Sequence, residues 1–433
     1  MMTEMKKSRS LSQFVMAVGA AAFGLMVTGC SPQECVDRFD CQNSKGAPPA
    51  GKQYTCEANV CVVKDIVPET PGTGSDAGTD AGTEPGPDAG TDAGTEPTSC
   101  ADLPHDAQLG TLQLQQGFTV VESAPLPASI DAITAVAGTS GSYSLYGVNS
   151  DKSVYALGTW PDVVASTTPL YPIVPADVTQ TSYVSGYLVS DGARLMGGYT
   201  LGDFSGKVAI HDLASNTSTY VPAAGNFSAV GLDGAFLING LGLEGVSGTG
   251  IGVYAVKTQS APFQTSKLAT FPSAGTFSGF SALATNEIVA LGYAYSTPEP
   301  DNDYATTNAL RAVSPDTYTP ALTAGTTLDL AGTNTPEIYS GLDLRDAAGF
   351  GAGVALKRSP NAGDYTNTRD VARIALTPTQ DGLGVTAGPL QEVLTQTKTC
   401  TKVVIMAPLA EDLLVGLEDK NGRRLVRLHA GTP

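Results

Sequence analysis

Carboxylates in two matching loops are the residues of this sequence that could bind a metal ion or a sugar. The loop sequences DYATTNAL, from Asp303, and DYTNTRDV, from Asp364, align at a constant offset of 61 residues. Asp301 and Asp303 share one side of an extended loop, and Asp370 lies in the second loop. Carboxylate oxygens suit calcium, and they also accept hydrogen bonds from sugar hydroxyls. Asp301, Asp303, Asp364 and Asp370 are therefore the candidate metal or ligand residues, with a pair of solvated acidic loops as the alternative.

Histidine, on which most metal sites and nucleophile–base pairs depend, is rare. His105, His211 and His429 are far apart in the sequence, and we expect each to be a solvated or hydrogen-bonded surface residue. No G-x-S-x-G nucleophile motif is present. GLGLEG, Gly240–Gly245, fits G-x-G-x-x-G, but a glycine-rich, strand-like stretch follows it instead of the helix that a dinucleotide site requires. We assign no catalytic residue, and no cofactor other than calcium at the acidic loops.

The charge balance excludes one class of partner. The chain has 24 Lys and Arg against 42 Asp and Glu, a net charge of −18. A polyanion of this kind repels nucleic acid and anionic lipid headgroups. Nucleic-acid binding is therefore not expected, and the acidity is better explained as a solubility feature.

The first 29 residues have the organisation of a secretory signal. Residues 1–10 carry Lys6, Lys7 and Arg9, and an uncharged apolar run of 17 residues follows, Leu11–Val27. A basic n-region followed by a short apolar h-region is typical of an export signal, and no other segment is long and apolar enough to predict a transmembrane helix.

The end of that run, Val27-Thr28-Gly29-Cys30, resembles the lipobox of bacterial lipoproteins. The resemblance covers the first thirty residues. It implies cleavage after residue 29 and lipidation of Cys30, so that the mature chain is held in the cell envelope by a lipid anchor. Ser31, a residue other than Asp, implies the outer membrane, with the chain on its periplasmic face or at the cell surface. An ordinary signal that happens to precede a cysteine is the alternative.

Cysteine arithmetic agrees with lipidation, because removing Cys30 from the seven cysteines leaves an even number. Four of the remaining six define a small module over residues 30–65, with the spacing C-x5-C-x14-C-x4-C: Cys35, Cys41, Cys56 and Cys61. In an oxidising compartment they predict a disulfide-rich knot with three alternative connectivities. Zinc is the rival interpretation, but no C-x-x-C pair is present. Cys100 and Cys400 are then left to pair with each other.

Residues 66–99 form a low-complexity stretch of Asp, Ala, Gly, Thr and Pro with acidic residues at every fourth position from Asp76 to Glu96 and no basic residue. Apart from proline, nothing in it between Gly72 and Ser99 is both apolar and larger than alanine, so it has too little apolar surface to bury. The composition predicts a disordered, self-repelling linker that gives the following domain reach from the anchor.

Residues 100–433 predict an all-β domain. Short apolar runs alternate with turns of Gly, Asn, Asp, Ser and Thr, and they recur as six repeats of 42–63 residues with about three to four strands each. The domain resembles a six-bladed β-propeller in architecture, without the signature of a named propeller family. Tandem β-sandwiches are the alternative.

The two ends of this domain predict how the ring closes. A spare strand over residues 109–123 precedes the first repeat, and the last repeat ends after RLVRLHA without a final strand. We expect the spare strand to complete the last blade, which removes an unpaired edge, and a Cys100–Cys400 disulfide to lock that joint.

The architecture predicts a binding role more readily than an enzymatic one. The expected function is that of a membrane-anchored envelope lipoprotein whose propeller is a non-catalytic scaffold for a protein or a glycan. The alternatives are a hydrolase or lyase acting on extracellular polysaccharide and a structural envelope spacer.

Overall fold

A computed structural model describes the chain over two separate units. The first unit is described at residues 52–57 and 60–65. The second is described between residues 99 and 431, with gaps at 179–180, 185, 202–205, 244–251, 271–274, 283–286, 299–303, 330–336, 341–346, 359–369, 382–383 and 397. Cys30, Cys35, Cys41 and residues 66–98 of the linker predicted over residues 66–99 lie outside the described residues.

The described part of the first unit is a β-hairpin of β1 (Lys52–Glu57) and β2 (Val60–Asp65). The strands pair antiparallel with Cys56 opposite Cys61, and Cys61 is disulfide-bonded. Two strands cannot bury a core alone, so a covalent link is what a hairpin of this size needs to stay folded.

Among its described residues the second unit consists of five antiparallel sheets, apart from one short parallel pairing, one α-helix and a short 3-10 helix at Thr139–Gly141. The first sheet consists of β5 (Ile130–Ala137), β6 (Tyr143–Asn149), β7 (Ser153–Thr159), β8 (Asp162–Val163) and β9 (Tyr171–Pro172). The third consists of β18 (Gly275–Ala282), β19 (Val289–Pro298), β20 (Tyr304–Val313) and β22 (Glu337–Ser340). The fifth consists of β27 (Lys402–Leu409), β28 (Asp412–Asp419), β29 (Gly422–Ala430) and β4 (Phe118–Pro125).

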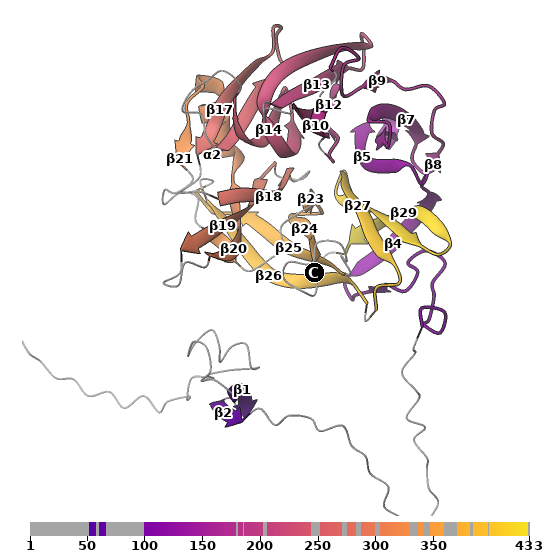
Figure 1. The fold of residues 1–433 in the computed structure, drawn as a ribbon, viewed down its shortest axis with the longest axis vertical. Coiled ribbons are helices and arrows are strands. Elements are labelled where there is room, and N and C mark those ends of the chain that lie inside the picture. Colours follow the sequence, from indigo (N-terminus) through magenta and orange to yellow (C-terminus); the bar gives the residue numbers. More distant parts are fainter. Residues whose placement is uncertain are drawn as a thin grey trace, which may run out of the picture. The chain divides into compact units, whose positions relative to one another are not determined.

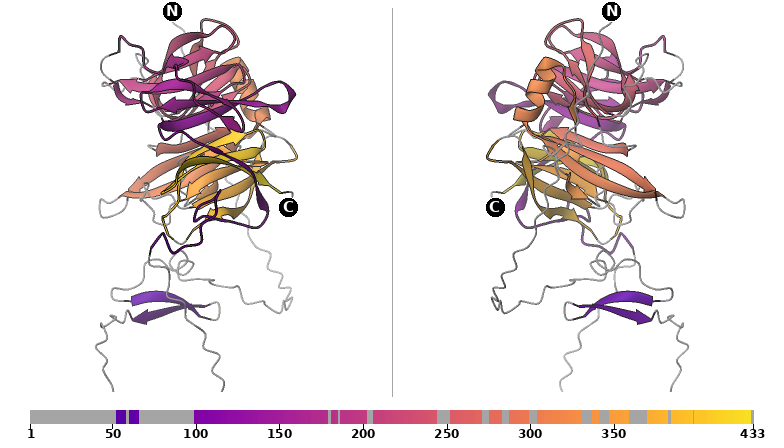
Figure 2. Two further views of the ribbon diagram at one scale, coloured as in Figure 1. Left: turned by 90° about the vertical axis from the view of Figure 1, so that its right-hand side faces the viewer. Right: turned by 90° about the vertical axis from the view of Figure 1, so that its left-hand side faces the viewer.

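The fourth sheet also takes a strand from the start of the domain. Its members are β23 (Ala347–Gly349), β24 (Gly353–Arg358), β25 (Asp370–Pro378), β26 (Val385–Thr395) and β3 (Gln113–Leu114). The helix α2 (Pro315–Ala324) follows β20 and contacts β17, and Figure 2 shows it as the orange coil at the edge of the domain.

The second sheet has nine strands: β10 (Thr181–Val184), β11 (Val189–Ser190), β12 (Arg194–Leu201), β13 (Gly206–Asp212), β14 (Thr217–Leu232), β15 (Ala235–Leu243), β16 (Gly252–Lys257), β17 (Gln264–Thr270) and β21 (Leu328–Asp329). β21 pairs parallel with β17.

The sheets are arranged in a ring, which defines a β-propeller (Figure 1). The strands that face the centre contact one another in the order β5, β11, β14, β18, β23 and β27, and β27 returns to β5. Each sheet therefore packs its faces against its two neighbours, as propeller blades do. The predicted all-β propeller is confirmed, and the alternative of tandem β-sandwiches is wrong.

The number of blades differs from the prediction. The described strands form five blades instead of six, because two of the predicted repeats share the nine-stranded sheet. The reason is β14, which is 16 residues long. Residues 217–223 pair with β13, and residues 224–232 pair with β15, so the chain passes from one repeat to the next without a break in the strand. The repeats in the sequence could not reveal that this connection is a continuous strand.

The start of the domain is built into its end. β4 pairs antiparallel with β29, the last strand of the chain, and β3 pairs with β26 of the preceding blade. The stretch predicted as one closing strand over residues 109–123 is thus two strands that serve two blades. The predicted disulfide is confirmed: Cys100 is bonded to Cys400 across a separation of 300 residues.

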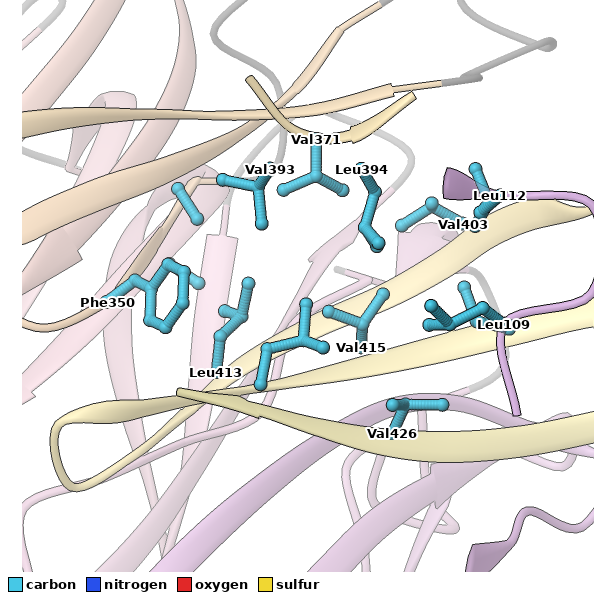
Figure 3. Close-up of a cluster of buried hydrophobic side chains, with 14 residues drawn as sticks. Leu109, Leu112, Phe350, Val371, Val393, Leu394, Val403, Leu413, Val415 and Val426 are labelled. Atoms are coloured by element: carbon cyan, nitrogen blue, oxygen red, sulfur yellow. The ribbon is translucent and has the colours of Figure 1, made fainter. Parts of the chain in front are cut away.

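A buried cluster joins the two blades that receive these strands (Figure 3). Leu109 and Leu112 lie just before β3, in the stretch from Cys100 to Leu112 that we call the N-terminal segment. They pack against Leu394 of β26 and against Val403 and Val426 of the last blade. Leu109 is 7% exposed and Leu112 4%. Burying each leucine contributes about 1.5–3 kcal/mol, so this segment is held by its core contacts as well as by strand pairing.

A second interface, between the first blade and the nine-stranded sheet, is rich in tyrosine. The rings of Tyr171 and His211 stack with their centroids 4.6 Å apart, and both side chains are buried. His211 Nδ1 lies 3.0 Å from Ser218 Oγ. The expectation that His211 is a surface residue is wrong, since alternation along β13 turns its ring toward the blade interface. Burial lowers the pKa of His211, against the opposing effects of Asp212 and Asn216.

Replacing Tyr199 by phenylalanine is expected to stabilise the domain. The Tyr199 side chain is fully buried, and its hydroxyl has no hydrogen-bond partner among the described residues. A buried hydroxyl without a partner costs about 1–3 kcal/mol, and Tyr199→Phe removes it while keeping the ring. We expect the free energy of unfolding, measured by urea denaturation, to rise.

The matched control is Tyr220→Phe, because the Tyr220 hydroxyl donates a hydrogen bond to the Pro172 carbonyl at 2.9 Å. That variant should lose about 1 kcal/mol. If Tyr199→Phe is destabilised as much as Tyr220→Phe, the Tyr199 hydroxyl has a hydrogen-bond partner and our interpretation of it is wrong.

Candidate functional site

Basic residues gather in the last blade of this acidic protein. Residues 398–433 contain six Lys and Arg against four Asp and Glu, whereas residues 100–397 contain 11 against 25. The six are Lys398, Lys402, Lys420, Arg423, Arg424 and Arg427. An approaching anion is therefore repelled by most of the propeller and least by this blade.

A tight hairpin turn between β28 and β29 positions the first residues of the candidate site. β28 and β29 are joined by Lys420 and Asn421, between the paired residues Asp419 and Gly422. The backbone N–H of Asn421 donates to Asp419 Oδ1 at 2.8 Å, and Gly422 has φ 106°, which side chains rarely adopt. The turn holds the Asp419 carboxylate at the end of β28.

Asp419 is a buried carboxylate with two charged or polar partners. Its side chain is 3% exposed, and its Oδ2 lies 2.9 Å from Arg424 Nη2 and 3.1 Å from His105 Nε2. Burial by itself raises the pKa of Asp419. Hydrogen bonds from Arg424, the Asn421 backbone and His105, together with the charge of Arg424, outweigh burial and lower that pKa below 3.8. The carboxylate is therefore ionised at neutral pH and orients both partners.

His105 comes to this carboxylate from the N-terminal segment, 314 residues away in the sequence. Its Nε2 also lies 3.2 Å from Asn421 Nδ2. Nε2 cannot donate to Asp419 and accept from Asn421 at once, and the buried anion favours the tautomer that donates. Nδ1 of His105 has no partner among the described residues.

A glycine allows the N-terminal segment to come this close. Asp106 and Gly110 exchange two backbone hydrogen bonds of 2.7 and 2.9 Å, and Gly110 has φ 68°. A Cβ at Gly110 would lie 2.8 Å from both Arg424 Nη2 and Asp419 Oδ2, and it would overlap the Thr401 hydroxyl. The backbone can therefore reach the ion pair only where the residue lacks a side chain.

Two pockets meet at His105. The larger, about 540 Å³, is lined by His105, Pro125, Asn421, Arg423 and Arg424, among others. The smaller, about 340 Å³, is lined by His105, Asp106, Gly110, Gln113 and Lys398, among others. Both volumes lie within the range of small-ligand pockets. We call the larger one the His105 pocket.

The basic residues of the His105 pocket are held in place by other bonds. Arg423 donates to Glu418 Oε2 at 2.6 Å and to the carbonyls of Ala128 and Ile130 at 2.6 and 2.7 Å. Arg424 donates to the Gln108 carbonyl and to Asp419. These bonds use Nε and one terminal nitrogen of each guanidinium. Arg423 Nη2 and Arg424 Nη1 remain without a partner among the described residues.

A second group of charges lies at the other end of the same strands. Asp412, whose side chain is 6% exposed, lies with its Oδ2 2.5 Å from Arg427 Nε and its Oδ1 2.7 Å from His429 Nδ1. His429 is half exposed, and its hydrogen bond to Asp412 agrees with the expected surface residue. This group lines neither pocket and pins β28 to β29.

Of the four carboxylates predicted as ligands, the structure describes Asp370, which does not line the His105 pocket. Asp301, Asp303 and Asp364 lie outside the described residues. Asp370 is the first residue of β25, and its Oδ1 accepts a hydrogen bond from the Gln396 backbone at 3.1 Å, so it ties β25 to the end of β26. The loops themselves join equivalent strands, since each connects the second and third strands of its blade.

The part of the chain that the structure describes contains no group of three or more His, Cys, Asp and Glu residues placed to hold a metal ion. Its helices include none long and apolar enough to cross a membrane.

Sequence reasoning missed the residues of the His105 pocket, although one local signal was available. The stretch Asp419-Lys420-Asn421-Gly422 between two apolar runs is typical of a two-residue hairpin turn, and two arginines follow it directly. Nothing in the sequence indicates that His105 approaches this turn.

Replacing Asp419 by asparagine is expected to destabilise the protein in a pH-dependent way. Asn keeps the shape but removes the charge that compensates the partly buried Arg424, which should cost about 2–3 kcal/mol at pH 7. Because the folded-state pKa of Asp419 is lowered, its stabilising effect is present above the unfolded pKa of about 3.8 and is lost as the pH falls through the folded value. Urea denaturation of both proteins should therefore show a gap at pH 7 that closes below about pH 4.

The control is Asp131→Asn, since Asp131 forms an exposed ion pair with Lys152 at 3.4 Å. It should cost less than about 1 kcal/mol at any pH. A gap for Asp419→Asn that is equally small at pH 7 would contradict the role assigned to the buried carboxylate.

The described residues from 99 to 431 thus define a β-propeller domain with a polar, basic pocket on its last blade. No family model matches the chain, and no curated protein sequence matches it either. Solved structures that are similar to it in fold include AofleA from Arthrobotrys oligospora (9% identity, 76% of this chain and 98% of that chain, TM-score 0.39). They also include the β-propeller domain of the Trilobed protease from Pyrococcus furiosus (10% identity, 70% and 96%, TM-score 0.37) and the six-bladed fungal lectin Aleuria aurantia lectin (11% identity, 72% and 99%, TM-score 0.34). At these scores the likeness carries nothing about function.

Proposed function

We propose that the chain is a bacterial envelope lipoprotein, anchored in the outer membrane through lipidated Cys30, whose propeller binds a protein or a glycan without catalysis. The lipobox-like Val27–Cys30 and the apolar run before it support the anchor. The disulfide between Cys100 and Cys400 fits an oxidising compartment outside the cytoplasm.

The observation that carries the binding role is the His105 pocket. Its polar side chains are fixed by buried or backbone partners before any ligand arrives: His105 by Asp419, Arg424 by Asp419, and Arg423 by the Ala128 and Ile130 carbonyls. Binding then immobilises few side chains, which preserves affinity. Asn421 and the free guanidinium nitrogens provide hydrogen-bond donors toward a ligand.

Replacing Cys30 by alanine is expected to release the protein from membranes. Without the thiol there is no site for the diacylglycerol group, and no other anchor is predicted. Metabolic labelling with a radioactive fatty acid should be lost, and the protein should move from the membrane pellet to the soluble fraction.

The matched control is Cys35→Ala, which removes a neighbouring cysteine but should keep the label and the membrane fraction. Density-gradient separation of inner and outer membranes tests the location of the unmodified chain. Continued membrane association of Cys30→Ala, or sedimentation of the unmodified chain with inner membranes, would contradict the corresponding part of the proposal.

A second candidate function is a hydrolase or lyase for extracellular polysaccharide, and one observation favours it. A buried carboxylate that holds a histidine, as Asp419 holds His105, is an arrangement that orients a general base. Chain shortening of an acidic oligosaccharide by the protein, abolished in His105→Gln, would support this function over simple binding.

A further inference from the structure

We propose that the His105 pocket binds the carboxylate of an acidic sugar, so that the ligand of the propeller is a glycan containing uronic acids. This inference rests on the proposed binding function and names the ligand class of the same site. It follows from the charge distribution, the free donors of the pocket and the chemistry of its lining.

The pocket offers an anion two partly buried guanidinium groups. The side chains of Arg423 and Arg424 are 14% and 13% exposed, and both line the pocket. Each keeps one terminal nitrogen without a partner among the described residues. Arginine donors fixed by other bonds recognise carboxylates well, because their geometry is set before binding.

The anions already present do not cancel this attraction. Asp419 and Glu418 are both engaged by arginine, and Asp419 is buried. Lys420 lies in the turn beside them, so residues 418–424 have three basic residues against two acidic ones. Since residues 100–397 are strongly acidic, this turn is where an anionic ligand is least repelled, and binding should weaken as salt screens the field.

The lining favours a sugar over an acidic peptide. Apart from Ala107 and Pro125, the pocket is lined by polar residues and glycine, and Asn421 and His105 suit hydroxyl groups. Peptide partners are usually held by buried apolar anchors. The only large apolar side chains exposed among the described residues of the propeller are Val121 and Val164, and neither lines the pocket.

The test is isothermal titration of the full chain with an oligogalacturonate and with its methyl ester, which has the same shape without the charges. We expect the acid to bind at least tenfold more tightly than the ester, with an affinity that falls as salt is raised. An oligoglutamate of equal charge, as a peptide anion, should bind at least tenfold more weakly than the oligogalacturonate.

Asn421→Asp places a negative charge in the pocket without changing its shape. We expect it to lower the affinity for the oligogalacturonate at least fivefold. The matched control is Asn216→Asp in the β13–β14 turn, where Asn216 is exposed as Asn421 is. It should leave the affinity for the acid unchanged. Arg423→Gln is a second pocket variant for which the same loss is expected. Thermal unfolding of each variant identifies any that fails to fold.

The outcomes separate this inference from the proposed function. Equal binding of acid and ester would overturn the carboxylate proposal and leave glycan binding intact. Tighter binding of oligoglutamate, or full affinity in both pocket variants, would overturn the assignment to this ligand or this pocket. If neither sugar binds, the inference is wrong, while the lipid anchor is judged by the Cys30→Ala experiment.

Discussion

Replacing both Cys100 and Cys400 by serine is expected to lower the free energy of unfolding of the propeller by about 4–5 kcal/mol. The disulfide closes a loop of some 300 residues, and its Cα atoms are 5.5 Å apart. In the chain-entropy model, a link across so long a loop restricts the unfolded chain strongly and therefore stabilises the folded one. The measurement is the urea midpoint of the double variant against the unmodified chain.

Local hydrogen bonds should preserve the folded structure of this variant. Thr111 donates to Gln396 Oε1 at 2.8 Å, and the backbone of Thr111 donates to Thr401 Oγ1 at 2.9 Å, next to the disulfide. The double variant is preferable to adding a reductant, since Cys61 is disulfide-bonded too and would also be reduced. An unchanged midpoint would show that strand pairing and core contacts alone account for closure.

Replacing Gly231 by alanine is expected to cost at least about 2–4 kcal/mol, or to prevent folding. Gly231 lies in the inner half of β14, where β14 contacts β11. A Cβ there would overlap the carbonyl oxygen of Ser190 and lie 2.9 Å from the backbone nitrogen of Asp191. Because these neighbours are backbone atoms, no side-chain rotation can relieve the clash.

The segment opposite Gly231 cannot shift easily. Asp191 Oδ1 accepts a hydrogen bond from the Arg194 backbone at 2.7 Å, and Thr258 donates to Asp191 Oδ2 at 2.8 Å. The alanine would therefore separate two inner strands of the ring.

The matched control is Gly388→Ala in β26, where a Cβ would meet only Ala375, with its nearest atom at 3.4 Å. That variant should change the free energy of unfolding by less than about 1 kcal/mol. Thermal and urea unfolding measure both variants. Equal stability of Gly231→Ala and the unmodified chain would show that β11 and β14 are not packed backbone to backbone.

The two substitutions differ in how far the sequence alone predicts them. The Cys100–Cys400 pair could be predicted because thiols in an oxidising compartment pair, and the other cysteines form a compact group of their own. Gly231 is one of 49 glycines, and nothing in the sequence distinguishes it, because its importance depends on Ser190 at the end of β11, 41 residues earlier in the chain.

For the propeller ring, the sequence likewise predicts the repeats but not how they join into blades. Alternating apolar runs and turns repeat along the chain, and this periodicity is a local property that the sequence displays directly. Whether one run continues into the next as a single strand is decided by hydrogen bonding on both sides. β14 has partners along its whole length, in β13 and then in β15, so two predicted blades became one sheet.

The His105 pocket shows most clearly which features the sequence alone cannot predict. The sequence by itself determined the cysteine pairing across the domain, the β-rich repeats and the acidic balance, because each depends on composition or on spacing along the chain. Only the tertiary structure decided that His105 meets Asp419, Asn421 and Arg424. Those contacts are made when the start of the domain adds β3 and β4 to the last two blades, and a glycine at position 110 permits the approach. The physical reason is that a pocket is made of side chains from distant segments, and their distances are set by packing and strand pairing rather than by their order in the sequence.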